Sequence, residues 1–395
     1  MLSILLVVIY VAFISLGLPD AILGSAWPSM YKELNVSVSY AGIIAMVIAG
    51  GTIVSSLFSE KVIRKFGTGI VTAASVALTA AALVGFSFSH AFWQLCLCAI
   101  PYGLGAGSVD AALNNFVALH YKSRHMNWLH CFWGVGAALG PLIMGQCLTN
   151  GLRWNSGYQA IGLIQIALVI GLVFTLPLWK VRQSESETAP ECREKRSMPD
   201  MLKLPGVKPV LLTFFCYCAM ETTAGLWASS YMVLYKGFGA EAAAKLASIF
   251  YLGITAGRFA SGFVSGRLGD RRMVRLGQAV AAFGIVFILF PFGNGTVPVG
   301  LALTGLGCAP IFPSLLHETP DNFGKENSQT IMGMQMATAY TGATFMPLLF
   351  GWIAERFTVG VYPFFLLVFA AGMFVMAERL NRVYAKRARA SAEQS

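Results

Sequence analysis

Twelve long apolar runs dominate the sequence and constrain its fold more than any other feature. A helix needs about 20 mostly apolar residues to cross about 30 Å of hydrocarbon. Runs of that kind lie at 2–30, 37–59, 69–89, 92–119, 127–149, 157–179, 208–235, 243–265, 273–292, 297–316, 328–352 and 359–381. The first run is too long for a signal peptide and contains Pro19 and Asp20, so it is counted as a span. The sequence therefore predicts an all-α membrane protein with twelve transmembrane helices.

The composition excludes several other classes of protein. Charged residues make up only 12% of the chain, about half of the 25% or so that is usual in soluble domains. The chain is also strongly apolar, with 56% hydrophobic residues and a mean hydropathy of +0.66. A soluble enzyme and a nucleic-acid-binding protein are excluded on this basis. The sequence contains no nucleotide-binding glycine loop, no HExxH motif and no loop long enough for a catalytic domain, so we expect no enzyme, and no cofactor or metal.

The net charge of +10 is unevenly distributed along the chain. Most lysines and arginines fall in the tail and in loops on the side that both ends of the chain share. The opposite loops contain Lys32, Arg153, Lys236, Lys245 and Arg356. Cytoplasmic loops of membrane proteins carry an excess of Lys and Arg. We therefore expect a multi-pass protein of the cell membrane with both termini in the cytoplasm.

A long polar segment divides the runs into two sets of six. We expect an N-terminal six-helix bundle at 1–180, a cytoplasmic linker at 181–207, a C-terminal six-helix bundle at 208–382 and a cytoplasmic tail at 383–395.

The two halves also resemble each other at matching places, at nearly the same spacing. The matched pairs are 102–105 with 304–307, 65–67 with 267–269, and 136–145 with 342–351. Two like-oriented halves imply a binding site between them near the middle of the membrane.

These motifs resemble the major facilitator superfamily of transporters along essentially the whole chain. The resemblance implies two pseudo-symmetric six-helix bundles and transport by alternating access. The loop with Glu60, Lys61, Arg64 and Lys65 resembles the family's loop between spans two and three, and its counterpart contains Arg267, Asp270 and Arg271. In the family such charges form a conformational latch. A plain basic cytoplasmic loop is the alternative for each.

Charges within a bilayer are costly, so each marks a candidate functional site. Asp110 shares a helix face with Gly103, Gly107 and Asn114. Residues 105–114 resemble the fourth helix of the fucose–proton symporter branch, where a Glu at the position of Asp110 carries the proton. The resemblance implies that Asp110 carries a proton. Asn114, on the same helix face, is predicted to contact the substrate. A hydrogen-bonded structural aspartate is the alternative.

Asp20, with Trp27 on its face of span one, begins an Asp-Ala-Ile-Leu stretch. This stretch resembles the Asp-Ile-Leu of the same branch, where the aspartate contacts sugar. Asp20 and Trp27 are therefore predicted to bind substrate, and Asp20 is a second candidate for proton coupling. Alternatively, Asp20 caps a helix that Pro19 breaks.

In span seven, Glu221, Trp227 and Tyr231 resemble a stretch of related sugar transporters, including sodium-dependent glucose transporters. They are predicted to bind substrate. Two alternatives for Glu221 are that it binds a cation or that it only neutralises Arg258 in the next span.

Span five adds three polar or aromatic residues and span eleven adds a glutamine. Asn127, His130 and Trp133 in span five and Gln335 in span eleven are predicted to line the substrate site. His130 is the only histidine within a span, so it is also a candidate for relaying a proton. A hydrogen-bonded core histidine is an equal alternative.

The sequence thus predicts a secondary transporter that takes up a small sugar or related polyol. The coupling ion is a proton or sodium, the partners are the sugar and the lipid bilayer, and the chain is expected to work as a monomer. Residues 136–145 also resemble the fifth-helix motif of drug–proton antiporters, so a proton-coupled exporter of drugs or metabolites is the alternative. A transporter-like sensor is a further alternative.

Overall fold

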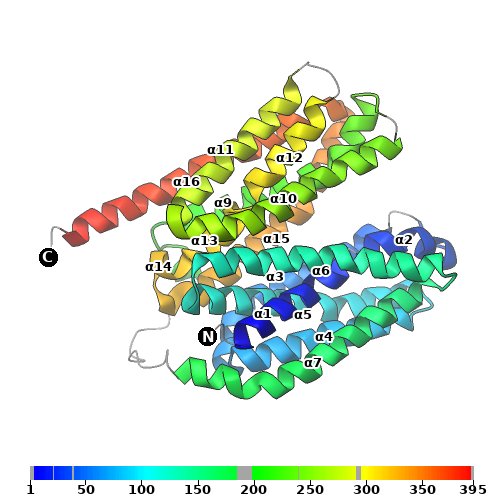
Figure 1. Ribbon diagram of the computed structural model, residues 1–395, viewed down its shortest axis with the longest axis horizontal. Helices are drawn as coiled ribbons and strands as arrows, with labels where there is room; N and C mark the ends of the chain where they lie inside the picture. Colours follow the sequence, from blue (N-terminus) through cyan, green and yellow to red (C-terminus); the bar gives the residue numbers. More distant parts are fainter. Residues whose placement is uncertain are drawn as a thin grey trace. The chain divides into compact units, whose positions relative to one another are not determined.

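The computed structural model describes residues 4–20, 22–37, 40–184, 198–238, 240–290 and 295–392. Within these ranges the chain forms helices joined by short loops (Figure 1). The first half consists of α1 (Ile4–Asp20), α2 (Ile22–Glu33), α3 (Ala41–Phe66), α4 (Thr68–Ser87), α5 (Phe92–His120), α6 (Ser123–Thr149) and α7 (Trp154–Ser184). The prediction of an all-α fold is confirmed for the part of the chain that the structure describes.

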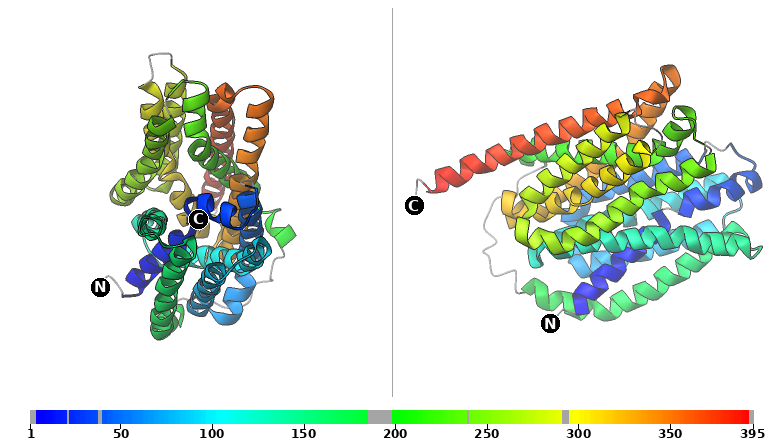
Figure 2. Two further views of the ribbon diagram at one scale, coloured as in Figure 1. Left: turned by 90° about the vertical axis from the view of Figure 1, so that its right-hand side faces the viewer. Right: turned by 45° about the horizontal axis from the view of Figure 1, so that its top comes forward.

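The second half repeats this plan with more interruptions. It consists of α8 (Met198–Met201), α9 (Val207–Leu234), α10 (Ala240–Leu268), α11 (Asp270–Leu289), α12 (Thr296–Cys308), α13 (Ile311–His317), α14 (Thr319–Phe323), α15 (Lys325–Arg356), the short 3₁₀ helix η2 (Val359–Val361) and α16 (Tyr362–Ala392). The predicted tail from residue 383 continues α16 as a helix to Ala392, and this helix extends past the neighbouring α11 (Figures 1 and 2).

The helices account for the twelve predicted spans. Among the described residues, ten helical stretches are long and apolar enough to cross a membrane. The two remaining spans are α10 and α15, which are equally long but carry more polar side chains. Span one combines α1 with α2, and span ten combines α12 with α13. The break in span ten lies at Pro310, because proline cannot donate the backbone hydrogen bond that continues a helix.

The chain folds as two compact units. The first contains Met1–Phe116 and Leu129–Lys195, and the second contains Val117–Trp128 and Arg196–Ser395. The main division falls within the predicted linker at 181–207, most of which lies outside the described residues. The segment Val117–Trp128, which ends α5 and begins α6, groups with the second unit, and the sequence did not predict this.

Each unit is held together by close helix packing. In the first unit Phe86 and Tyr158 stack with ring centroids 5.2 Å apart, within a core that also contains Trp27 and Trp154. Gly136 and Gly140 of α6 lie directly against backbone carbonyls of α1, and Gly342 of α15 lies against a backbone carbonyl of α9. These glycines are required because a Cβ atom has no room there. Gly136 and Gly140 of the 136–145 pattern therefore have a packing role that needs no antiporter function.

Candidate functional site

In the first unit, Asp20 lies at the junction of α1 and α2 and is held by two donors from other helices. The Tyr102 hydroxyl on α5 donates to Asp20 Oδ1 at 2.8 Å, and Trp133 Nε1 on α6 donates to Asp20 Oδ2 at 2.9 Å. Both donors are neutral side chains. Each carboxylate oxygen accepts two hydrogen bonds, so each keeps capacity for a further donor.

The surroundings of Asp20 are open, although it lies within a span. Its side chain is exposed in the structure. Four residues later in the chain, a Cβ atom placed on Gly24 of α2 would meet no atom of another segment within 4 Å. The Trp133 indole beside the carboxylate is only half-buried. The site therefore presents a fixed acceptor and an aromatic ring to accessible space.

A second polar group in the same unit is a buried chain of three side chains. Asn114 Nδ2 donates to Asp110 Oδ1 at 2.8 Å, and Asn114 Oδ1 lies 3.0 Å from Nε2 of His130 on α6. All three residues are at most 6% exposed. An amide oxygen carries no hydrogen, so the hydrogen of this second bond belongs to His130 Nε2. The predicted i, i+4 relation of Asp110 and Asn114 is thus a direct hydrogen bond.

The helix face of α5 that carries Gly103 and Gly107 packs against α3. Gly103 and Gly107 lie against the backbone of α3. Thr52 Oγ1 donates to the Gly103 carbonyl at 3.2 Å and Ser56 Oγ donates to the Gly107 carbonyl at 3.2 Å. This polar seam fixes the helix that carries Tyr102, Asp110 and Asn114.

Two predicted residues of the first half lie elsewhere. Trp27 is 5% exposed and packs in the hydrophobic core of the first unit. Asn127 is fully buried and its Nδ2 donates to the Ser123 carbonyl at 3.1 Å, within the segment that belongs to the second unit.

In the second unit, the carboxylate of Glu221 on α9 faces the guanidinium of Arg258 on α10. Arg258 Nη2 lies 3.4 Å from Glu221 Oε1, and the side chains are 6% and 18% exposed respectively. This pairing is the structural alternative that the sequence left open for Glu221. The acid inside span seven is therefore neutralised by a cation, whereas Asp20 is bonded to Tyr102 and Trp133.

The other predicted residues of the second half bond to neighbouring helices. Trp227 Nε1 donates to the Pro347 carbonyl on α15 at 3.1 Å. Tyr231 is buried and its ring lies 5.0 Å from that of Tyr362. Gln335 Nε2 donates to Thr319 Oγ1 at 3.1 Å. The structure gives each of these side chains a structural contact and does not gather them around Glu221.

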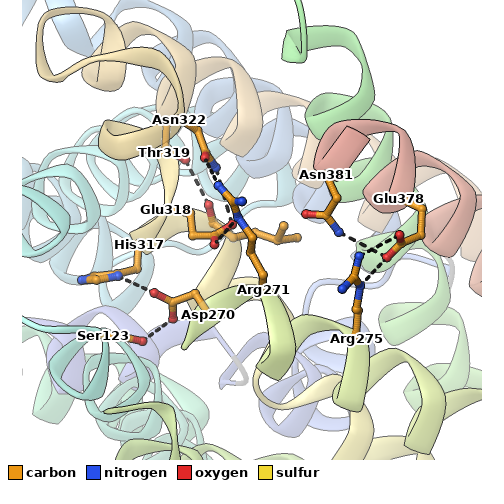
Figure 3. Close-up of polar contacts among 11 residues, drawn as sticks. Ser123, Asp270, Arg271, Arg275, His317, Glu318, Thr319, Asn322, Glu378 and Asn381 are labelled. Carbon is orange, nitrogen blue, oxygen red and sulfur yellow. Dashed lines mark hydrogen bonds and ion pairs between the residues drawn. The ribbon is translucent and has the colours of Figure 1, made fainter. Parts of the chain in front are cut away.

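A third polar group lies where α11 begins, and we call it the α11 cluster. It consists of Ser123, Asp270, Arg271, His317, Glu318 and Asn322 (Figure 3). Asp270 accepts a hydrogen bond from the Ser123 hydroxyl at one oxygen and lies 2.7 Å from His317 Nδ1 at the other. Arg271 donates to Glu318 at 3.2 Å and to Asn322 at 3.3 Å. Of the predicted latch residues of this loop, Asp270 and Arg271 belong to the cluster, whereas Arg267 is exposed at the end of α10.

The corresponding loop of the first half makes only short-range contacts among the interactions that the structure describes. Arg64 pairs with Glu60 one turn earlier at 3.1 Å, and both are partly exposed. Lys61 and Lys65 lie over the rings of Phe58 and Phe66 of the same helix.

The sequence did not identify Tyr102 or His317 as functional residues. A tyrosine in an apolar helix was a usable signal, because a buried phenol hydroxyl usually finds a hydrogen-bond partner. His317 follows directly after an apolar span and precedes Glu318. That pair of titratable residues at a helix end was the available signal.

Comparison with known proteins identifies the class. The sequence model of the Major Facilitator Superfamily matches residues 9–245 and 210–394, which together cover nearly the whole chain. The chain therefore belongs to this superfamily. It is a multi-pass membrane transporter with the twelve-helix fold of that family, not an enzyme, as the sequence predicted.

Individual relatives are distant but cover most of the chain. "Bypass of stop codon protein 6" of Saccharomyces cerevisiae is 23% identical over 389 residues, covering 89% of this chain and 76% of that protein. The glucose/mannose transporter GlcP of Bacillus subtilis is 22% identical over 367 residues, covering 89% and 88%. The solved structure of the E. coli fucose:proton symporter FucP has the same fold, with a TM-score of 0.77, 16% identity and coverage of 95% and 98%.

Proposed function

We propose that this protein takes up a small sugar or related polyol together with protons, by alternating access. In this proposal it works as a monomer in the cell membrane with both termini in the cytoplasm. The observation that carries the proposal is the Asp20 carboxylate, which Tyr102 and Trp133 hold beside open space.

The chemistry of this group suits a polyhydroxylated molecule. Sugar hydroxyls donate hydrogen bonds to carboxylate oxygens, and hydrogen bonds to charged groups are worth about 1.5–3 kcal/mol. The apolar face of a sugar ring packs against an indole, which Trp133 supplies. Two of the proteins described above support this substrate class by their names, a glucose/mannose transporter and a fucose:proton symporter.

The Asp110–Asn114–His130 chain is the proposed coupling element. Asp110 accepts a hydrogen bond from Asn114, and Asn114 accepts one from His130. When Asp110 takes up a proton, one of its oxygens becomes a donor and the carboxyl group loses its charge. Because Asn114 contacts both titratable groups, a proton on Asp110 changes the bonding of His130 as well. Burial of a carboxyl group makes such neutralisation favourable.

Transport in reconstituted vesicles tests this proposal. Purified protein in liposomes is given labelled hexoses, pentoses and polyols under an imposed inward proton gradient, with an inward sodium gradient as the parallel arm. We expect accumulation of one sugar group under the proton gradient, and its loss in Asp20→Asn. Accumulation driven only by sodium would contradict the assigned coupling ion. Export of hydrophobic cations without any sugar uptake would support the antiporter alternative.

A further inference from the structure

The imidazole of His317 lies between two hydrogen-bond acceptors. Its Nδ1 is 2.7 Å from Asp270 Oδ2 (Figure 3). Its Nε2 is 3.1 Å from the backbone carbonyl of Tyr121. A carbonyl oxygen carries no hydrogen, so Nε2 must donate. The other oxygen of Asp270 accepts a hydrogen bond from the Ser123 hydroxyl. An ionised carboxylate has only acceptor oxygens, so opposite an ionised Asp270 the Nδ1 atom must donate as well.

This geometry requires a doubly protonated ring. We propose that His317 is a proton-binding site at the start of α11 and that its proton holds the segment Val117–Trp128 against α11 and α13. When the proton leaves to water, the ring is neutral and retains one N–H and one lone pair. One of the two acceptors, the Asp270 carboxylate or the Tyr121 carbonyl, then faces a lone pair, and that bond is lost. The site therefore holds the segment less tightly as pH rises.

Solvent screens the ion pair of His317 and Asp270 only weakly. The side chains of His317 and Asp270 are 17% and 11% exposed, so little solvent reaches the pair. The other acids near the ring are Asp321 on α14 and Glu318, which adjoins it in the chain. Glu318 is paired with Arg271, whose guanidinium lies 5.2 Å from the ring centre of Tyr384 on α16.

The segment Val117–Trp128 also carries charged residues near this site. Lys122 and Arg124 flank Ser123, both are exposed, and Arg124 Nε donates to His125 Nε2 at 3.2 Å. Burial raises the pKa of Glu318 to about 7, against the opposing effect of Arg271. This carboxyl group therefore titrates in the same range as histidine, and an experiment has to separate the two.

The segment held by His317 connects two helices that carry the polar groups of the first unit. The helix α5 carries Tyr102, Asp110 and Asn114, and α6 carries His130 and Trp133. A proton at His317 therefore acts on the ends of the helices that hold the proposed substrate and coupling residues. The inference does not depend on which substrate is transported or on the coupling ion.

A distance measurement within the second unit tests the site. Spin labels are attached through introduced azide-bearing residues at Lys122 and Arg272, which are both exposed, so the native cysteines stay in place. The distance distribution is recorded by pulsed electron resonance from about pH 5 to about pH 8, the range in which histidine titrates. We expect a short distance at acidic pH and a growing population of longer distances as pH rises.

Four variants separate the candidate groups. His317→Gln cannot carry the charge, so the long distance should be present at every pH. His317→Lys keeps a fixed positive charge and should show the short distance throughout. Glu318→Gln should keep the response of the unchanged protein. His90→Gln, at an exposed histidine in the loop between α4 and α5, is the matched control and should also respond normally.

Two kinds of result would overturn the proposal. A wild-type distance that is the same at every pH would overturn the proposal. So would a pH response that persists in His317→Gln or disappears in Glu318→Gln, because the titrating group would then be another residue. If His317→Lys does not fold, the pH series of the unchanged protein and of His317→Gln still decide the question.

Discussion

The two halves of the molecule use their charges in opposite ways. Inside the spans, the first unit bonds its acids to neutral side chains: Asp20 to Tyr102 and Trp133, and Asp110 to Asn114. The second unit places Glu221 against Arg258. The halves also differ at the helix ends. The charges of the first-half loop contact their own helix, whereas those of the second half join different helices in the α11 cluster.

The two loops share a backbone but not a side-chain pattern. Gly67 and Gly269 have φ angles of 80° and 76°, and each begins the next helix from the left-handed region that favours glycine. Thr68 follows the first glycine, whereas Asp270 follows the second. The internal repeat therefore preserves the turn, whereas only the second loop places an acidic residue directly after the glycine.

The largest effect is expected at Asp110. Asp110→Asn removes the proton-binding carboxyl group but keeps a side chain of the same shape that accepts from Asn114. We expect complete loss of proton-driven accumulation and retention of sugar exchange across the vesicle membrane. Uptake and counterflow in proteoliposomes measure the two separately. Loss of exchange as well would show that Asp110 has a binding or structural role.

The Glu221–Arg258 pair should matter for stability more than for coupling. Removing one partner of a buried ion pair leaves an uncompensated charge, which typically costs about 3–5 kcal/mol. Because Glu221 and Arg258 make a single contact of 3.4 Å, we expect Glu221→Gln to cost about 2–4 kcal/mol. The double variant Glu221→Gln/Arg258→Gln should recover most of this loss. Thermal unfolding in detergent measures both. A double variant as unstable as the sum of the single changes would contradict the pairing as the main role.

The two matching loops should differ in the same assay. Asp270→Asn weakens a mostly buried pair with His317, and we expect it to destabilise the protein by about 1–3 kcal/mol. Arg64→Gln removes an exposed pair with Glu60, which is worth about 0–1 kcal/mol. Equal losses of stability in the two variants would contradict the proposed difference between the loops.

The last expected effect is a pH dependence of stability from Glu318. Burial raises the pKa of this carboxyl to about 7 from the usual 4.5, so the folded state binds the proton more tightly than the unfolded state. Its contribution to stability is therefore complete below about pH 4.5 and is lost as pH rises through about 7. Glu318→Gln should flatten this part of the stability profile. Titration of thermal unfolding measures it, and an unchanged slope in the variant would refute the assignment.

The sequence predicted the features that repeat along one helix. The apolar runs, the two halves and the helix break near Pro310 follow from hydropathy and from the geometry of proline. The Asp110–Asn114 bond was accessible because residues four apart share a helix face. These contacts need no knowledge of how the helices are rotated against each other.

The sequence could not predict contacts that depend on that rotation. Tyr102 is 82 residues from Asp20, and His317 is 47 residues from Asp270. Neither spacing indicates that the side chains meet. The grouping of Val117–Trp128 with the second unit depends on tertiary contacts in the same way. Trp27 shared the face of Asp20 by spacing, but it packs in the hydrophobic core of the first unit.

The central claim is that Asp20 is the substrate-binding carboxylate, and ligand-induced thermal stabilisation tests it most directly. Purified protein is screened with hexoses, pentoses, deoxy sugars and hydrophobic cations, because any ligand that binds the folded state raises its stability by mass action. Asp20→Asn is compared with Asp200→Asn, a control at a partly exposed carboxylate of α8. We predict stabilisation by one sugar group, weakened about 10- to 100-fold in affinity by Asp20→Asn and unchanged by Asp200→Asn. Equal sugar binding by Asp20→Asn and the unchanged protein would contradict the account.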